Sequence, residues 1–187
     1  MIELKNVSFS YSDRQVLKNF SLRIEKGERI CLYGDSGIGK TTILRLIAGL
    51  EKAENNTVIC TDKNFSVVFQ EDRLLPFKTV KENISLFSHN DRIDYILNEL
   101  GIYEARDQLP SQLSGGMARR ASMARALSTN ADVYIFDEPF TGLDEDNIMQ
   151  AVRLINEITA GKTLITVLHE KEYAKLLNCT IVEVPKI

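Results

Sequence analysis

The sequence contains no tryptophan, only three cysteines and only four prolines among its 187 residues. An odd number of cysteines without metal-ligand spacing predicts small core residues of a reducing compartment: Cys31, Cys60 and Cys179. No stretch is rich in Pro, Gly or Ser, and the chain has no internal repeat and no low-complexity tract. These absences argue against a disulfide scaffold, an array of linked domains and a repeat protein.

An excess of positive charge is also missing. The 26 Asp and Glu side chains outnumber the 23 Lys and Arg, which gives a net charge of −3 and a pI near 5.5. A sequence-independent nucleic-acid binder needs a basic face, so we predict no nucleic-acid partner. No apolar stretch approaches the roughly 18 residues of a membrane span, and the N-terminus MIELKNVSFS lacks a signal-peptide core. We therefore expect a soluble chain whose membrane role, if it has one, comes from a partner.

The length fits a single domain, residues 1–187, because domains average on the order of 150 residues. Apolar residues that alternate or cluster in short runs predict strands at residues 2–11, 20–24, 29–33, 65–69, 133–136, 163–168 and 179–184. Helical spacing of apolar residues predicts a helix over 43–50, a helical block from Val80 past Phe87 to about Leu127, and a helix around 148–155. This alternation of strands and helices predicts an α/β fold around a central, mostly parallel sheet.

The segment GDSGIGKTT, residues 34–42, lies between a predicted strand and a predicted helix. Gly34, Gly39, Lys40 and Thr41 have the spacing of a phosphate-binding loop, in which glycines let backbone N–H groups turn toward a pyrophosphate. The helix N-terminus adds partial positive charge, the lysine reaches the β- and γ-phosphates, and the Thr41 hydroxyl holds Mg²⁺. A plain Gly-rich turn would not explain the Lys-Thr pair. We predict nucleotide binding by Gly34, Asp35, Ser36, Gly37, Ile38, Gly39, Lys40, Thr41 and Thr42.

A second acidic motif, DVYIFDEP, ends the predicted strand 133–136 with two carboxylates. Ligands of parallel sheets bind at the carboxyl ends of the strands, where Asp137 and Glu138 lie. Asp137 is placed to serve Mg²⁺ through its water shell. Glu138 is placed to polarise a water aimed at the γ-phosphate, which is general-base catalysis worth about 10²- to 10⁴-fold.

The stretch QLSGGMARRASMARAL, residues 112–127, carries a further candidate anion site. Ser114, Gly115 and Gly116 stand just before a predicted helix and can present a hydroxyl and free N–H groups to an anion. The alternative for Ser114 is simple N-capping of that helix.

With these motifs, the sequence resembles the nucleotide-binding subunit of ABC transporters over almost its whole length. The matching features occur in the family's order: Tyr11, the phosphate loop, Gln70, LSGG at 113–116, FDEP at 136–139, GLD at 142–144 and His169. The resemblance implies a P-loop NTPase fold with an N-terminal antiparallel β subdomain. It divides the domain into a core ATP-binding subdomain, 1–69 and 128–187, and a helical signature subdomain, 70–127. It also implies ATP and Mg²⁺ as cofactors, and ATP hydrolysis as the activity.

The resemblance assigns roles to residues that the pattern alone leaves open. Tyr11 matches the aromatic that stacks on adenine, although alternation alone allows a core-facing neighbour of Phe9. Gln70 matches the glutamine that touches Mg²⁺ and the attacking water. His169 matches the histidine that contacts the γ-phosphate and orients Glu138.

Two other polar residues are less determined. Asp144 matches the aspartate whose loop crosses to a second subunit, and it also fits the N-cap of the helix that follows. His89 matches no motif and is interpreted as a solvated residue.

The resemblance also implies partners. Two chains would form an ATP-dependent head-to-tail homodimer, with ATP held between the phosphate loop of one and the LSGG of the other. A transmembrane permease would dock near residues 70–77, where Leu74, Leu75, Pro76 and Phe77 form an apolar cluster; local packing beneath the helical block is the alternative. An extracytoplasmic solute-binding protein would complete the complex. The chain would lie in the cytoplasm, on the inner face of the cell membrane.

The strings VVFQEDRLLPFKTVKENI, QLSGGM and DEPFTGLD are similar to those of nitrate, sulfonate and taurine importers, in which a methionine often occupies the Met117 position. The segment between Gly49 and Gln70 is shorter than is usual, and the end of the chain soon after Val184 leads us to expect no C-terminal regulatory domain. A non-transport ABC ATPase acting on DNA, repair or translation complexes is the main alternative, but the long coiled-coil or zinc-bearing insert of such proteins is missing. A small-molecule phosphoryl transferase would leave Ser114 and His169 unexplained.

Overall fold

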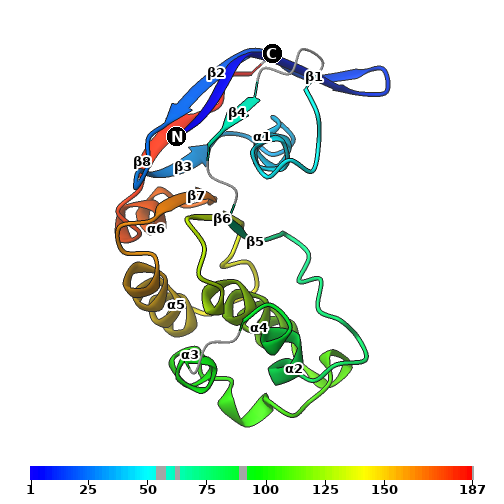
Figure 1. The fold of residues 1–187 in the computed structure, drawn as a ribbon, viewed down its shortest axis with the longest axis vertical. Helices are drawn as coiled ribbons and strands as arrows, with labels where there is room; N and C mark the ends of the chain where they lie inside the picture. The colour runs from blue at the N-terminus through cyan, green and yellow to red at the C-terminus, as the bar shows by residue number, and fades with distance from the viewer. Residues whose placement is uncertain (54–57, 62–63, 89–91, 187) are drawn as a thin grey trace.

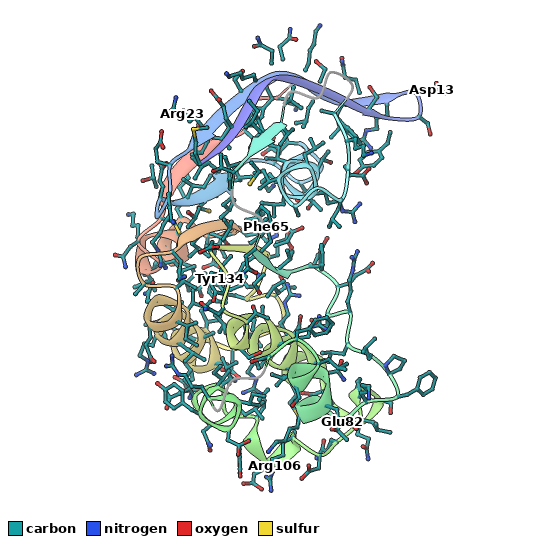
Figure 2. The ribbon with its side chains drawn as sticks, viewed as in Figure 1. Asp13, Arg23, Phe65, Glu82, Arg106 and Tyr134 are labelled. Atoms are coloured by element: carbon teal, nitrogen blue, oxygen red, sulfur yellow. The ribbon has the colours of Figure 1, made fainter. Side chains whose placement is uncertain are left out.

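A computed structural model describes residues 1–53, 58–61, 64–88 and 92–186. His89 and part of the short segment between Gly49 and Gln70 lie outside the described residues. The molecule is elongated, with an antiparallel sheet at one end, a parallel sheet in the middle and a group of helices at the other end (Figure 1). Asp13 and Arg106 mark the two ends in Figure 2.

The N-terminal strands form a three-stranded antiparallel sheet in the order β2-β1-β4. Strands β1 (Ile2–Tyr11) and β2 (Arg14–Ile24) form a long hairpin that pairs from Ile2 opposite Ile24 to Tyr11 opposite Arg14. The predicted antiparallel β part is therefore confirmed. The short strand β4 (Val58–Cys60), which pairs with the first residues of β1, was not predicted.

The central sheet has five strands in the order β5-β6-β7-β3-β8, and every pairing between these described strands is parallel. The strands are β3 (Arg29–Tyr33), β5 (Phe65–Val68), β6 (Val133–Asp137), β7 (Thr163–Val167) and β8 (Thr180–Glu183). Strands β6 and β7 are buried along their whole length, as their uninterrupted apolar sequences predict. The predicted α/β architecture is confirmed, with strand limits that differ from the prediction by one residue or so.

The central sheet is covered on both faces. Because side chains alternate along a strand, Val133 and Ile135 of β6 belong to the core shared with the antiparallel sheet and α1 (Lys40–Ile47). Tyr134 and Phe136 belong to the core on the opposite face, which the helices α4 (Gly115–Ser128) and α5 (Glu145–Ile158) close. Two hydrophobic cores therefore hold the sheet between them, and its strand ends keep fixed positions.

The helical end also contains α2 (Val80–Ser85), α3 (Ile93–Glu99) and two short 3-10 turns, η1 (Tyr103–Ala105) and η2 (Pro110–Gln112). A last helix, α6 (Lys171–Leu176), was not predicted. Two apolar residues depart from the prediction: α1 ends at Ile47 and leaves Leu50 54% exposed, and α2 ends at Ser85 and leaves Phe87 59% exposed. Neither side chain joins the core face that helical spacing assigned to it.

The cysteines fit their predicted role as core residues in part. Cys31 and Cys179 are buried, and burial raises the pKa of the two thiols to about 11 and about 12, so neither is a reactive thiolate at neutral pH. Cys60 is only half-buried. Among the described residues, no helix has the length and apolar character that crossing a membrane requires.

Candidate nucleotide site

The predicted phosphate loop connects the end of β3 to the start of α1. Gly39 is the last residue before the helix and has a φ of 108°, in the left-handed region that favours glycine. A Cβ on Gly39 would lie 3.0 Å from side-chain atoms of Val16 and Leu17 and 3.1 Å from the Val16 carbonyl oxygen. The loop therefore packs directly on β2, and both its backbone conformation and its closest contact require glycine at this position.

Lys40 opens α1, and its residue is only 6% exposed. Its Nζ donates hydrogen bonds to the carbonyl oxygens of Gly34, at 2.7 Å, and Asp35, at 2.9 Å. The ammonium group is thus held across the loop, while the first N–H groups of α1 point out of the helix end. A lysine ammonium in the loop that precedes a helix N-terminus is an arrangement that attracts a pyrophosphate.

A pocket of about 350 Å³ lies beside this loop, and its lining includes Tyr11, Gly37, Lys40, Thr41 and Thr42. The Tyr11 ring is 40% exposed and meets Phe9 edge-on, with ring centroids 4.8 Å apart. Its hydroxyl donates to Glu51 Oε1 over 3.4 Å. Tyr11 therefore contacts Phe9 and borders the pocket, but its exposure shows that it does not face the core. Its stacking on adenine stays a prediction.

Asp137 ends β6 and is only 3% exposed. Burial raises the pKa of its carboxyl group, and a hydrogen bond from Thr41 partly offsets that effect. Its Oδ1 has no hydrogen-bond partner within the described part of the chain. Asp137, Thr41 and Gln70 border a small cavity of about 50 Å³. A buried carboxylate oxygen without a partner, a hydroxyl and an amide are oxygen donors of the kind that Mg²⁺ prefers, so this group of residues fits the metal.

Glu138 and His169 lie side by side, with Glu138 Oε1 2.9 Å from His169 Nε2. They follow the ends of the neighbouring strands β6 and β7, whose pairing places Asp137 opposite Val167. Glu138 has a positive φ of 50°, and its N–H donates to the Val167 carbonyl oxygen over 3.1 Å. The strand pairing therefore brings together the two residues that the sequence analysis linked.

The LSGG segment lies elsewhere on the molecule. Ser114 is the N-cap of α4, and its hydroxyl accepts a hydrogen bond from the Met117 N–H over 3.3 Å. Ser114 and Gly115 are exposed, and neither borders the pocket around Lys40 or the cavity around Asp137. The predicted N-cap role of Ser114 is observed. The exposed N-terminus of α4 is also accessible to an anion that another molecule holds.

Asp144 caps α5. Its carboxylate accepts hydrogen bonds from the Asn147 backbone N–H over 2.9 Å and from the Asn147 side chain over 2.7 Å. The backbone hydrogen bond is the main reason why the pKa of Asp144 is lowered. The N-cap alternative is therefore observed, while a contact with a second subunit stays a prediction.

Arg119, a buried arginine of α4, was not predicted as a site residue. Its guanidinium donates to carbonyl oxygens of both the Gln70 and the Glu138 segments. An arginine in an exposed-looking MARRAS string carries no local sign of burial. The carbonyl groups that accept its hydrogen bonds come from distant segments, which only the fold brings together.

Comparisons with known proteins show which family this chain resembles. A family model described as "ABC transporter" matches residues 17–141. The arginine transport ATP-binding protein ArtM of Bacillus subtilis is 34% identical over 94% of this chain and 83% of its own length. The aliphatic sulfonates import ATP-binding protein SsuB 1 of Rhodococcus jostii is 35% identical over 95% of this chain and 76% of its own length. Among solved structures, the dimeric bacterial ABC transporter cassette MJ0796 superposes with a TM-score of 0.85 at 27% identity, covering 100% of this chain and 96% of the cassette.

Proposed function

The chain belongs to the ABC transporter ATP-binding family, whose members are ATPases, and we propose that its ATP hydrolysis powers solute import through a separate membrane permease. The observation that carries the proposal is the Glu138–His169 pair, 2.9 Å apart at the ends of two adjacent parallel strands and next to the buried Asp137. That arrangement suits a carboxylate base held in one orientation beside a phosphate site.

In the proposed reaction, the loop amides and Lys40 hold the β- and γ-phosphates of ATP. Glu138 accepts a proton from the water that attacks the γ-phosphorus, and His169 fixes the orientation of the carboxylate. Thr41, Asp137 and Gln70 would hold Mg²⁺, which neutralises charge on the phosphate oxygens. Glu138 lies at the rim of the site, with a side chain that is 17% exposed, so its carboxylate can reach a water from solvent.

The exposed position of Ser114 and Gly115 supports a head-to-tail homodimer. These residues lie outside the pocket of their own chain, so they serve the nucleotide only if a second copy brings them to it. A related cassette has been solved as a dimer, and a post-hydrolysis dimer has been solved with ADP and Pi. We propose the same division of the chain as the sequence analysis: a core of residues 1–69 and 128–187, and a signature subdomain of residues 70–127.

The permease is proposed to dock on the loop that follows Gln70. Phe77 is 92% exposed and Leu75 is 41% exposed, whereas Leu74 packs against the helical core, so packing beneath the helices accounts for only part of this apolar cluster. The buried Asn83 side chain accepts from the Leu75 N–H over 2.7 Å and donates to the Lys78 carbonyl over 2.9 Å. The loop is thus held in a fixed shape that presents Phe77 outward, as a docking site requires.

For the transported solute, we propose only a broad chemical class. Relatives of similar identity are named for arginine, glutamine, aliphatic sulfonates and spermidine/putrescine. The motif strings favour the sulfonate-type importers among these. In such systems a permease and a solute-binding protein would choose the solute, and this chain would lie on the cytoplasmic face of the membrane.

The test is the molar mass of Glu138→Gln in solution, measured by size-exclusion chromatography with light scattering, with and without MgATP. Removal of the base leaves ATP bound but unhydrolysed, so the mass should double from monomer to dimer on addition of MgATP. The matched control is Glu138→Gln combined with Ser114→Arg, which should bind ATP and remain monomeric. A dimer that forms equally well with the Ser114→Arg change would contradict the shared site.

A further inference from the structure

Arg119 is the most deeply buried cation of α4, the signature helix that begins within LSGG, and is only 3% exposed. A buried guanidinium is costly unless hydrogen bonds and a counter-charge satisfy it. Here Asp72 supplies the counter-charge, with its Oδ1 3.2 Å from Nη1. Backbone carbonyl groups of two separate segments accept hydrogen bonds from the other guanidinium N–H groups.

One group of acceptors lies in the turn that carries Asp137 and Glu138. Nη2 donates to the carbonyl oxygens of Asp137, at 2.9 Å, and Glu138, at 2.5 Å, and Nε donates to that of Pro139, at 3.2 Å. Glu138 has a φ of 50°, a strained conformation for a residue with a side chain. The Arg119 hydrogen bonds on both peptide groups around Glu138 help to hold that conformation, and the conformation directs the side chain to His169.

The second group of acceptors is the loop that carries Gln70. Nη1 donates to the carbonyl oxygens of Phe69, at 2.6 Å, and Gln70, at 3.1 Å, besides its contact with Asp72. The planar guanidinium therefore spans both segments at once, which a lysine ammonium or a glutamine amide is too small to do. A change of position of either segment has to be accommodated by the other through this one group.

We propose that Arg119 is a positioning residue that fixes Glu138 and the Gln70 loop relative to each other, so that the loop proposed to meet the permease sets the position of the catalytic base. This inference rests on the proposed function of Glu138 and Gln70. It assigns to the signature helix a second role, inside its own chain, in addition to the anion site at Ser114.

The test compares three variants. Arg119→Lys keeps the charge and loses the span between the two segments. Asp72→Asn removes the counter-charge of Arg119, which also acts on Arg125. The Asp72 side chain is 30% exposed, so this variant is the least disruptive to folding. Arg125→Lys is the matched control: Arg125 lies in the same helix and donates to the carbonyl oxygens of Arg73, at 2.8 Å, and Asp72, at 3.1 Å. Its replacement leaves in place the Arg119 hydrogen bonds to Phe69, Gln70 and the Glu138 turn.

Two readouts are made on the full chain well below the melting temperature of each variant. The first readout is kcat and KM for MgATP. A misplaced base should lower kcat by about 10²-fold in Arg119→Lys and by less in Asp72→Asn. KM should stay close to the wild-type value in both variants. The second is the imidazole Cε1–H NMR resonance of His169, assigned with His169→Gln. It should move in Arg119→Lys and Asp72→Asn, and stay in place in Arg125→Lys.

A wild-type kcat together with an unmoved His169 resonance in Arg119→Lys would overturn the proposal. If Arg119→Lys does not fold, Asp72→Asn decides: a moved resonance supports the positioning role, and an unmoved one overturns it. An equal response in Arg125→Lys would also overturn it, because general loosening of the loop would then suffice. The NMR readout needs no hydrolysis, so a chain without ATPase activity would contradict the proposed function and still leave this inference measurable.

Discussion

The Thr41 hydroxyl hydrogen-bonds the Asp137 carboxylate across the space between the phosphate loop and the end of β6. Residues 96 positions apart in the sequence, from Thr41 to Asp137, thereby form one oxygen-rich group around a cavity of about 50 Å³. The hydrogen bond only partly offsets the burial of Asp137. The nucleotide-free protein therefore keeps a carboxylate in a position that is unfavourable for its charge.

Asp137→Asn should raise the melting temperature of the nucleotide-free protein at neutral pH while it weakens MgATP binding. Burial raises the pKa of Asp137 in the folded state, so folding favours the neutral carboxyl group more than the unfolded chain does. The destabilising effect of the buried carboxylate is absent at pH values well below its ordinary pKa of 3.8. The effect grows as the pH rises from 3.8 through the raised pKa of the folded state, and it is constant at higher pH. The difference in melting temperature between variant and wild type, measured from pH 3 to 7 by differential scanning fluorimetry, should grow over that interval. A difference that is independent of pH would contradict the explanation.

Gly39→Ala should abolish ATP binding and lower stability by about 1–3 kcal/mol, because φ is 108° at this position and the new methyl group would press on Val16 and Leu17. Gly49→Ala is the matched control. It has a positive φ of 71°, but no atom of the described residues lies within 4 Å of the place that an alanine Cβ would take there. It should lose stability by about 1–2 kcal/mol from backbone strain alone and keep its ATP affinity. Isothermal titration with ATP separates the two; equal ATP affinity in both variants would show that the contact with β2 is unimportant.

His169→Ala should lower kcat by about 10²-fold with little change in KM, because the Glu138 carboxylate loses the partner that orients it. The His169 side chain is 56% exposed, so the variant should fold with an unchanged melting temperature. Steady-state hydrolysis of MgATP provides the measurement. A large increase in KM at constant kcat would instead mean that His169 serves ATP binding and has no part in orienting the base.

Local sequence patterns were sufficient to predict those parts of the structure that depend on residues close together in the chain. The phosphate loop, the buried strand predicted at residues 133–136 and the cap of α5 all follow from residue types within one turn or one strand. The pairing of Glu138 with His169 was available only through the family resemblance, since nothing in either local sequence connects them.

The predictions that were wrong or missing have a different origin. Leu50 continues the apolar spacing of α1, but Gly49 adopts a φ of 71° that ends the helix first. Strand β4 is only three residues long and exists through its pairing with β1, a contact that no local pattern encodes. Arg119 looks like a solvated helix residue until the fold brings carbonyl groups from two distant segments to it.

Phe77→Asp should leave the folding stability within about 0.5 kcal/mol of the wild type, because the Phe77 side chain is 92% exposed. The same change should prevent docking of the permease, since a charge would replace the most exposed apolar group of the loop. The measurement is the fraction of the chain that sediments with membranes containing the permease. Leu50→Asp, which alters another exposed apolar residue at 54% exposure, is the control and should sediment like the wild type. Normal sedimentation of Phe77→Asp would place the docking surface elsewhere.

Two substitutions of Asp144 separate its two interpretations, the helix N-cap and the contact with a second subunit. Serine and aspartate are comparable N-caps, so Asp144→Ser should keep the cap on Asn147 and the wild-type melting temperature, whereas Asp144→Ala should melt roughly 2–4 °C lower. The lowered pKa of Asp144 adds a pH signature: its contribution to stability is present above the ordinary value of 3.8 and is lost as pH falls through the lower folded pKa. The difference between wild type and Asp144→Ala should therefore shrink in acid.

The same two variants decide whether Asp144 also meets a second subunit. Each is combined with Glu138→Gln, and the fraction of dimer is measured by light scattering at increasing MgATP. If the carboxylate contacts the partner, both variants should need more MgATP to dimerise, although only Asp144→Ala has lost stability. If Asp144 is a cap and nothing more, Asp144→Ser should dimerise like its parent, because a hydroxyl can replace the carboxylate at a helix N-terminus but cannot supply its charge to a facing chain.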